Sequence, residues 1–239
     1  MAKYNVLTEG NIKIQKGEKK GFYSVILHFA PSIFSGYQVC PKASAGCIAT
    51  CLNTAGRGGM FKAGENTNTI QEARKRRTRM FFEQRAAFMD LLVADIEHAV
   101  KRAAKLDLTL TVRLNGTSDL PWEKIRIGTF RNIMERFPNV QFYDYTKIIQ
   151  RVLSSNLPSN YHLTFSASED NHAQARTLLS LGYSVTVVCT REVKEWAVSN
   201  ANAIDGDETD LRFLDVPGSI VALSAKGRAK KDTSGFVIR

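Results

Sequence analysis

The chain has 239 residues, of which 44% are hydrophobic and 23% are charged, the balance of a globular protein long enough to bury a sizeable core. No apolar run approaches the roughly 20 residues of a membrane-spanning helix, and the N-terminus lacks the basic-then-apolar pattern of a signal peptide, so we expect a cytoplasmic protein without membrane contact. The net charge of +10 favours nucleic acid or a nucleotide-like substrate as partner, with a merely soluble basic protein as the alternative.

Six short runs rich in β-branched and aromatic residues predict strands. Several of these runs are almost continuously apolar, as is typical of strands that are covered on both faces. The runs are 22–30, 108–114, 140–145, 161–165, 184–189 and 219–223.

Helical segments are predicted between these strands. Segment 68–105 has apolar residues at helical spacing after a candidate N-cap at Asn68 or Thr69, and its length predicts two helices or a kink. Further helices are predicted for 123–137, which stops before Pro138, for 171–181, which stops at Gly182, and for 191–200.

The alternation of strands and helices predicts an α/β fold with a parallel sheet and right-handed crossovers. An open doubly wound sheet would fit, but we favour a partial (β/α)6 TIM-like barrel with parallel strands, because polar residues follow nearly every strand. We expect one domain over residues 1–239, with a cysteine loop (36–60) and a C-terminal segment (201–239) packing on the barrel.

Polar side chains at the ends of five predicted strands favour a shared active-site rim, since catalytic residues of α/β folds lie at the C-terminal ends of strands. Exposure alone could explain any single cluster. The candidate catalytic residues are Asp119 and Asp144, as general bases, and Lys147, which could hold phosphate or carboxylate. Alternation along the strand places Asp144 on the same face as Phe142, and Tyr143 with Tyr145.

Three cysteines, Cys40, Cys47 and Cys51, lie directly after the first predicted strand. Paired structural disulfides are not expected in a reducing cytosol, whereas three thiolates this close can bind one metal centre. A 4Fe–4S cluster held by three cysteines leaves one iron open for an exogenous ligand. A structural zinc site would need a fourth ligand, and three thiols without metal remain the other alternative.

A cysteine loop after the first strand, followed by five further strand–helix units, resembles the radical S-adenosylmethionine (SAM) superfamily. The resemblance implies a six-unit partial barrel, an iron–sulfur cluster on Cys40, Cys47 and Cys51, and SAM bound by residues after the second and fourth strands. In this sequence those cofactor-binding residues would be Asn115, Gly116, Thr117 and Ser118 after the second strand, and Ser166, Ser168 and Glu169 after the fourth.

At finer grain, residues 40–60 together with 113–119, 142–147 and 205–215 resemble a family of phage-encoded proteins named only as gene products. This resemblance spans most of the chain. It implies a phage or prophage setting, and therefore the host cytosol, but it assigns no reaction.

Basic residues are concentrated near the start of the long helical segment. They are either a solvated helix face or a nucleic-acid-binding patch, whose binding would weaken steeply with salt. The candidate nucleic-acid-binding residues are Arg57, Arg74, Lys75, Arg76, Arg77 and Arg79.

Together these features favour a phage-associated enzyme that uses an iron–sulfur cluster and SAM to modify a nucleic acid or nucleotide-like substrate. A second hypothesis is base exchange of the deazaguanine or guanine transglycosylase type on DNA or tRNA, with Asp119 or Asp144 as nucleophile. A third is a non-catalytic basic nucleic-acid-binding protein in which a metal such as zinc only stabilises the loop.

Overall fold

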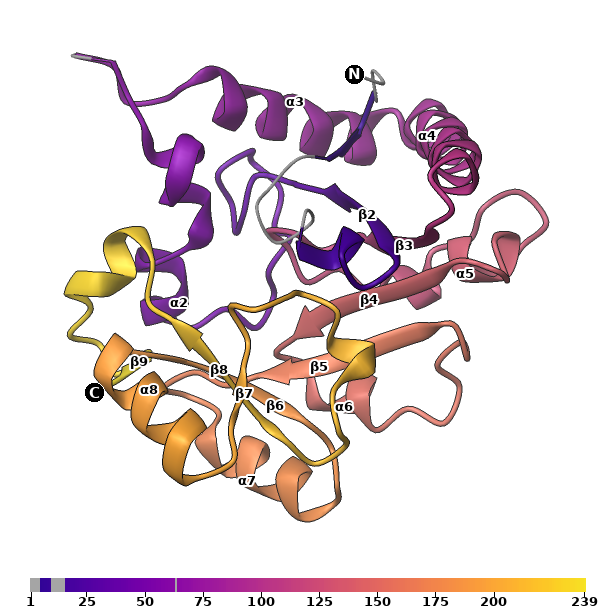
Figure 1. Ribbon diagram of the computed structural model, residues 1–239. Helices are drawn as coiled ribbons and strands as arrows, with labels where there is room; N and C mark the ends of the chain where they lie inside the picture. Colours follow the sequence, from indigo (N-terminus) through magenta and orange to yellow (C-terminus); the bar gives the residue numbers. More distant parts are fainter. Residues whose placement is uncertain (1–4, 10–15, 63) are drawn as a thin grey trace.

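The computed structural model describes residues 5–9, 16–62 and 64–239, and Figure 1 shows their arrangement. Six parallel strands lie side by side in chain order. All six were predicted from the sequence. They are β2 (Phe22–Leu27), β3 (Thr109–Arg113), β4 (Gln141–Thr146), β5 (Tyr161–Ser166), β6 (Val185–Cys189) and β8 (Ile220–Ser224).

Three two-residue strands complete the sheet. β1 (Leu7–Thr8) pairs antiparallel with β2, and β7 (Ile204–Asp205) pairs parallel with β8. β9 (Val237–Ile238) pairs with Val188 and Cys189 of β6, just beyond the point where the pairing of β5 with β6 ends at Thr186. The C-terminus therefore fills the gap that opens between β5 and β6.

The predicted α/β class with a mostly parallel sheet is confirmed, but the sheet is open. Among the described residues the strand order runs from β1 at one edge to β7 at the other, with β9 beside β6, and the two edges do not pair. The strand pairing therefore does not give a closed TIM-like barrel.

The long helical prediction divides into two helices, as expected. α3 (Thr69–Glu83) begins at Asn68, whose side chain accepts a hydrogen bond from the Gln71 amide, and α4 (Arg85–Lys105) follows after a break at Gln84. α7 (His172–Ser180) and α8 (Arg191–Asn200) also match their predictions, and Gly182 after α7 has a left-handed φ of 83°, which glycine adopts without strain.

The predicted helix over 123–137 is wrong. Only η3 (Trp122–Lys124) and α5 (Ile133–Arg136) are helical, and a turn at Gly128, with φ 53°, separates them. Asn132 starts α5 afresh because its side chain accepts from the Glu135 amide, a capping role that competes with an unbroken helix. The other short elements are α2 (Ala45–Ala49), η1 (Leu52–Thr54), η2 (Gly56–Gly59), α6 (Ile149–Val152), η4 (Arg212–Leu214) and η5 (Gly227–Lys231).

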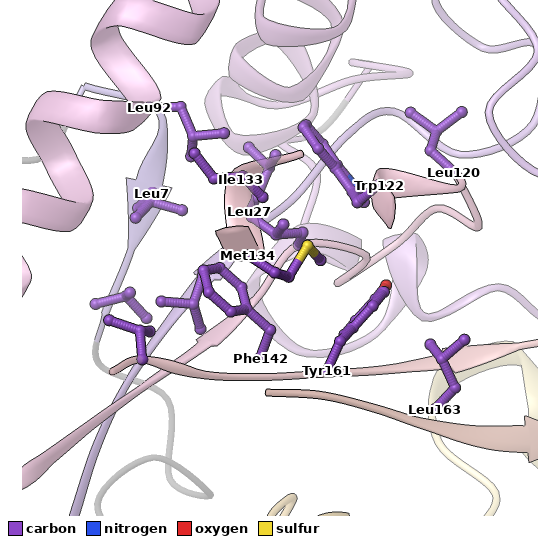
Figure 2. Packing of buried hydrophobic residues seen from close by; sticks show 14 of the residues in the cluster. Leu7, Leu27, Leu92, Leu120, Trp122, Ile133, Met134, Phe142, Tyr161 and Leu163 are labelled. Atoms are coloured by element: carbon purple, nitrogen blue, oxygen red, sulfur yellow. The ribbon is translucent and has the colours of Figure 1, made fainter. Parts of the chain in front are cut away.

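Helices cover one face of the sheet, called the helix face below. α4 packs on β2 and β3, α7 on β5 and β6, and α8 on β7 and β8. Figure 2 shows strand side chains such as Phe142 and Leu27 packed with Leu92, Ile133 and Met134. Burying a side chain of this size contributes about 1.5–3 kcal/mol, so this layer holds the sheet in place.

The opposite face, called the inner face, carries no helix of this set but is crossed by the segment 206–215, called the strap. The Phe213 ring of the strap lies 5.3 Å from the Phe22 ring and 5.7 Å from the Tyr143 ring. A Cβ added at Gly206 would lie 2.7 Å from side-chain atoms of Val221 and Leu223. The strap therefore runs from β8 across the sheet towards β2, as the orange loop in Figure 1 shows.

Candidate functional site

The C-terminal ends of the parallel strands meet at one edge of the sheet, called the rim. Lys147, after β4, donates from its backbone amide to Asp119 Oδ2 at 2.8 Å and from Nζ to the Ser166 hydroxyl at 3.0 Å. Cys40 Sγ lies 3.7 Å from the carbonyl oxygen of Thr117. The structure thus brings together predicted rim residues that follow four different strands.

The three cysteines lie on this rim, and the sulfur atoms of Cys40 and Cys51 receive backbone hydrogen bonds. The Ser32 amide donates to Cys40 Sγ at 3.4 Å, and the Asn53 amide donates to Cys51. Cys47 lies within α2, and all three thiols are free. Hydrogen bonds donated to sulfur stabilise the thiolate, which is the form that binds metals.

Burial raises the pKa of each thiol, to about 12 for Cys40, to about 11 for Cys51, and above its usual value for Cys47. Cys47 and Cys51 further raise the pKa of Cys40, and Cys47 raises that of Cys51, so the thiols lie close enough to interact. Two cations act in the opposite direction: Lys147 lowers the pKa of Cys47, and Arg74 lowers that of Cys51. Burial of the three side chains therefore favours the protonated thiols.

Glu169, a predicted cofactor ligand, holds α2 against the loop after β5. Its carboxylate accepts from the Gly46 amide at 2.7 Å and from the Ser44 hydroxyl at 2.8 Å. A Cβ added at Gly46 would lie 2.2 Å from Ser234 Oγ and 2.6 Å from Glu169 Oε1. The close approach of α2, which carries Cys47, thus requires glycine at this position.

Asp119 belongs to a buried charge network below the rim. Its Oδ1 lies 2.6 Å from Arg151, which also binds Glu123 at 2.8 Å and the Tyr161 hydroxyl at 3.1 Å. Burial raises the pKa of Asp119, while Arg151 and the Lys147 amide lower it. With all these partners, Asp119 links the loop after β3 to the loop after β4.

Asp144 points to the helix face, where it shares a side with Phe142 as alternation predicts. It accepts from the Asn115 amide at 2.7 Å, from Asn115 Nδ2 at 3.2 Å and from the Tyr161 hydroxyl at 2.8 Å. Burial raises its pKa to about 6, opposed most strongly by Arg113. Through its two hydrogen bonds with Asn115, Asp144 therefore fixes the start of the loop after β3.

Other predicted cofactor ligands also make bonds within their own loops. Ser118 donates to Asn115 Oδ1 at 2.8 Å, and the amide of the buried Ser168 donates to Asn171 Oδ1 at 2.7 Å. Gly116 packs so closely on the end of β2 that a Cβ would overlap it. These contacts set the backbone path of the two loops that flank the cysteines.

The basic residues of α3 divide into two groups. Arg74 donates to Asn53 Oδ1 in the cysteine loop at 2.6 Å, whereas Arg77 donates to the His28 carbonyl at 2.9 Å and Arg79 to the Ser35 carbonyl at 3.2 Å, both before that loop. Burial lowers the pKa of Arg77 to about 10. These arginines hold the loop that carries the cysteines and the segment before it.

The remaining basic candidates face outward. Arg57 and Arg76 are exposed, and Lys75 forms an ion pair with Glu72 at 2.9 Å. Arg79 is also exposed, although it donates one hydrogen bond.

The sequence matches the family described as gene product 88 over residues 5–239. The chain belongs to that family. No curated protein and no solved structure matches the chain. The reaction of this gene product 88 family member therefore cannot be taken from a relative.

The three free thiols at the rim are the kind of side chain that binds a metal centre, but their sulfur atoms are not arranged around a common point. No three His, Cys, Asp or Glu side chains in the described ranges form a group that could hold a metal ion. Cys40 and Cys51 nevertheless accept backbone hydrogen bonds, Lys147 lowers the pKa of Cys47, and Arg74 lowers that of Cys51. No helix in this part of the chain is long and apolar enough to cross a membrane.

Sequence reasoning missed the inner face of this gene product 88 family member. Arg113, Tyr143 and Tyr145 alternate with buried apolar or carboxyl residues, and they face the strap side together with His162 and Thr164. The signal was present in the sequence as polar residues at every second position of β3, β4 and β5, within runs that otherwise appear continuously apolar.

Proposed function

We propose that Cys40, Cys47 and Cys51 hold an iron–sulfur cluster at the rim and that the protein is a radical-SAM-like enzyme. The observation that supports this proposal is that three free thiols, of which Cys47 and Cys51 raise the pKa of Cys40, follow the first of six in-order parallel strands. An open sheet in this order, with α4, α7 and α8 on one face, is also what an opened six-unit partial barrel would have.

Charge supports an anionic group at this position. Three thiolates would bring negative charge to a rim where Arg74 lies beside Cys51 and Lys147 beside Cys47. Both cations are largely buried, and burial lowers the pKa of each. Buried cations are stabilised by a nearby anion, so a thiolate-bound cluster would complete the electrostatics of the rim.

The chain's own residues would position the cofactors. We propose that the loop 115–118, which Asp144 and Ser118 fix in place, lies beside SAM, and that Glu169 keeps Cys47 in position through α2. The cluster, when bound, supplies the electron that cleaves SAM reductively. Lys147, which donates to Ser166 and lies near Cys47, would hold a carboxylate or phosphate group of the bound molecule.

A nucleic acid or nucleotide-like substrate fits the net charge of +10. Arg57, on the cysteine loop, and Arg76, on α3, are exposed and would contact phosphates, as would the exposed part of Arg79. Base exchange by a carboxylate nucleophile is less well supported, because Asp119 binds Arg151 and Asp144 faces the helices.

The decisive experiment is anaerobic purification or reconstitution followed by iron and sulfide analysis, a visible spectrum and an assay for 5′-deoxyadenosine. We expect a coloured protein that forms 5′-deoxyadenosine from SAM after reduction. Cys40→Ala, Cys47→Ala and Cys51→Ala should each lose the cluster. The matched control is Cys189→Ala, since Cys189 is buried at the end of β6, bonds to the Leu223 carbonyl, and has its pKa shifted by burial, Lys194 and Asp207 rather than by the other three cysteines.

Two results would refute the proposal. One is a colourless protein that contains stoichiometric zinc, and the other is a cluster that survives all three single replacements. Circular dichroism of each variant would separate loss of the cluster from loss of the fold.

A further inference from the structure

Buried polar atoms without a hydrogen-bond partner gather on the inner face. Within the described residues they are found on five neighbouring chain segments that follow or form β2 to β6. The atoms are His28 Nδ1, Arg113 Nε, the Tyr145 hydroxyl, His162 Nε2, Thr164 Oγ1 and Thr186 Oγ1. Buried polar groups in folded proteins nearly always have a partner, so a set like this on one surface points to a ligand.

Strand register places these groups on the same side of the sheet. Tyr143 pairs with His162, and Tyr145 pairs with Thr164. Paired residues of neighbouring parallel strands point to the same face, and Tyr143 faces the strap through its contact with Phe213. The unpartnered atoms therefore face the interior between the sheet and the strap, with the rim above them.

Arg113 supplies one positive charge of this surface, and the buried Arg212 of the strap supplies a second, which acts on Tyr145 and His162. Arg113 Nη1 forms an ion pair with Asp210 of the strap at 3.1 Å, and its guanidinium lies 4.7 Å from the centre of the Tyr145 ring. The side chain is 11% exposed. Its Nε has no hydrogen bond, since the nearest carboxylate oxygen, on Asp144, is 3.9 Å away.

A guanidinium presents a planar fork of N–H groups that matches the two oxygens of a phosphate or carboxylate. Here Asp210 of the strap takes one arm of that fork at 3.1 Å, and Asp144 of β4 lies 3.9 Å from Nε, beyond hydrogen-bond distance. The hydroxyls of Tyr145, Thr164 and Thr186, on the next three strands β4, β5 and β6, offer neutral donors and acceptors on the same face. One oxyanion and several neutral polar groups would satisfy the surface.

We propose that the inner face below the rim binds a small molecule that carries an oxyanion, with Arg113 holding the oxyanion and Tyr145, Thr164 and Thr186 contacting its polar groups. Asp210 makes the contact that the oxyanion of the ligand would otherwise make. The strap is thus an internal competitor for the site. This inference goes beyond the proposed function, because it concerns a different surface and needs neither a cluster nor SAM.

The competition has a definite consequence for affinity. Replacing Asp210 with Asn removes the competing charge but keeps the shape of the side chain, so oxyanions should bind about tenfold more tightly. Replacing Arg113 with Met removes the cation that holds the oxyanion and should abolish binding. Arg113→Lys keeps the charge but lacks the planar fork, so it should weaken binding. It provides the test if Arg113→Met does not fold.

The test is calorimetric titration of the full chain as purified with four probes: inorganic phosphate, adenosine monophosphate, citrate and adenosine. We expect the oxyanions to bind and adenosine not to bind. Binding of phosphate and the nucleotide but not citrate would identify a phosphoryl ligand, and equal binding of citrate would identify a general oxyanion ligand; both outcomes support the site. Arg131→Met, whose side chain is 81% exposed, is the control and should bind like the wild type.

Two outcomes would overturn the inference. In one, neither the wild type nor Asp210→Asn binds any oxyanion. In the other, Arg113→Met folds and binds as the wild type does. Neither outcome bears on the cluster, which is measured by iron content, so failure of this site and failure of the proposed function are distinguishable.

Discussion

Glu169 accepts a hydrogen bond from the Gly46 amide at 2.7 Å, across 123 residues of chain. The same carboxylate accepts from the Ser44 hydroxyl. Because Gly46 lies one residue before Cys47, the loop after β5 fixes the position of one cysteine relative to the sheet. The rim is therefore held together by a carboxylate that would otherwise be assigned to ligand binding.

Glu169→Ala should lower the free energy of unfolding by about 2 kcal/mol, because hydrogen bonds to a charged acceptor are worth more than neutral ones. Asp170→Ala is the matched control, since the neighbouring Asp170 is exposed. Urea denaturation of both variants measures the difference. Equal stability of the two variants would show that the carboxylate does not hold α2.

Gly116 lies where the loop after β3 crosses the end of β2. A Cβ there would be 2.5 Å from His28 Nδ1 and 2.7 Å from Ile26 Cγ2. Gly116→Ala should therefore destabilise the protein by about 1–3 kcal/mol through overpacking. His28→Ala should restore part of this loss in the double variant, because it removes the ring that the new methyl group meets. Denaturation of the two single variants and the double variant checks this, and strict additivity would contradict it.

Strand positions were predictable because β-branched and aromatic runs are local signals. Residues 161–165 and 184–189 became β5 and β6 with shifts of one residue at their ends. The helix over 123–137 failed for an equally local reason that a pattern of apolar spacing overlooks, since Asn132 caps α5 and the chain turns at Gly128. The short strands β1, β7 and β9 depend on their partners and have no signal of their own.

The sequence predicted which residues lie at the rim, but not which residues they contact. Strand-end reasoning found Asp119, Lys147 and Glu169, which the structure places on one edge. It could not find that Arg151 binds Asp119 or that Asp210 reaches Arg113, because these pairs are 32 and 97 residues apart in the chain. Long-range pairing of this kind is set by the assembled fold rather than by a local pattern.

Arg151 is the centre of the buried charge network below the rim. Its side chain is 3% exposed and lies between Asp119 and Glu123. Arg151→Met would leave two carboxylates without their cation, so we expect a loss of about 3–5 kcal/mol. Arg131→Met removes an arginine paired with Glu135 at the surface and should change stability by less than about 1 kcal/mol. Urea denaturation compares them, and similar losses in both would argue against a buried network.

The free energy of unfolding should depend on pH because the pKa of Asp144 differs between the folded and the unfolded protein. Burial raises its pKa to about 6 in the folded protein, above the value of about 3.9 in an unfolded chain. Between about pH 4 and pH 6 the folded state therefore binds more protons at this carboxyl than the unfolded state does. The contribution of Asp144 is fully present below about pH 4 and is lost as the pH rises through 6, by an amount on the order of 3 kcal/mol.

Asp144→Asn provides the comparison, because an amide does not titrate and keeps one oxygen that can accept from the Asn115 amide. The wild type should exceed this variant in stability most at low pH, and the gap should narrow as the pH rises from about 4 to about 7. Asp170→Asn, at an exposed position, should follow the wild type across this range. Urea midpoints at several pH values measure the gap. A gap that is constant or widens with pH would mean that the Asp144 carboxyl is ionised in the folded protein throughout, stabilised by Arg113 and its hydrogen bonds.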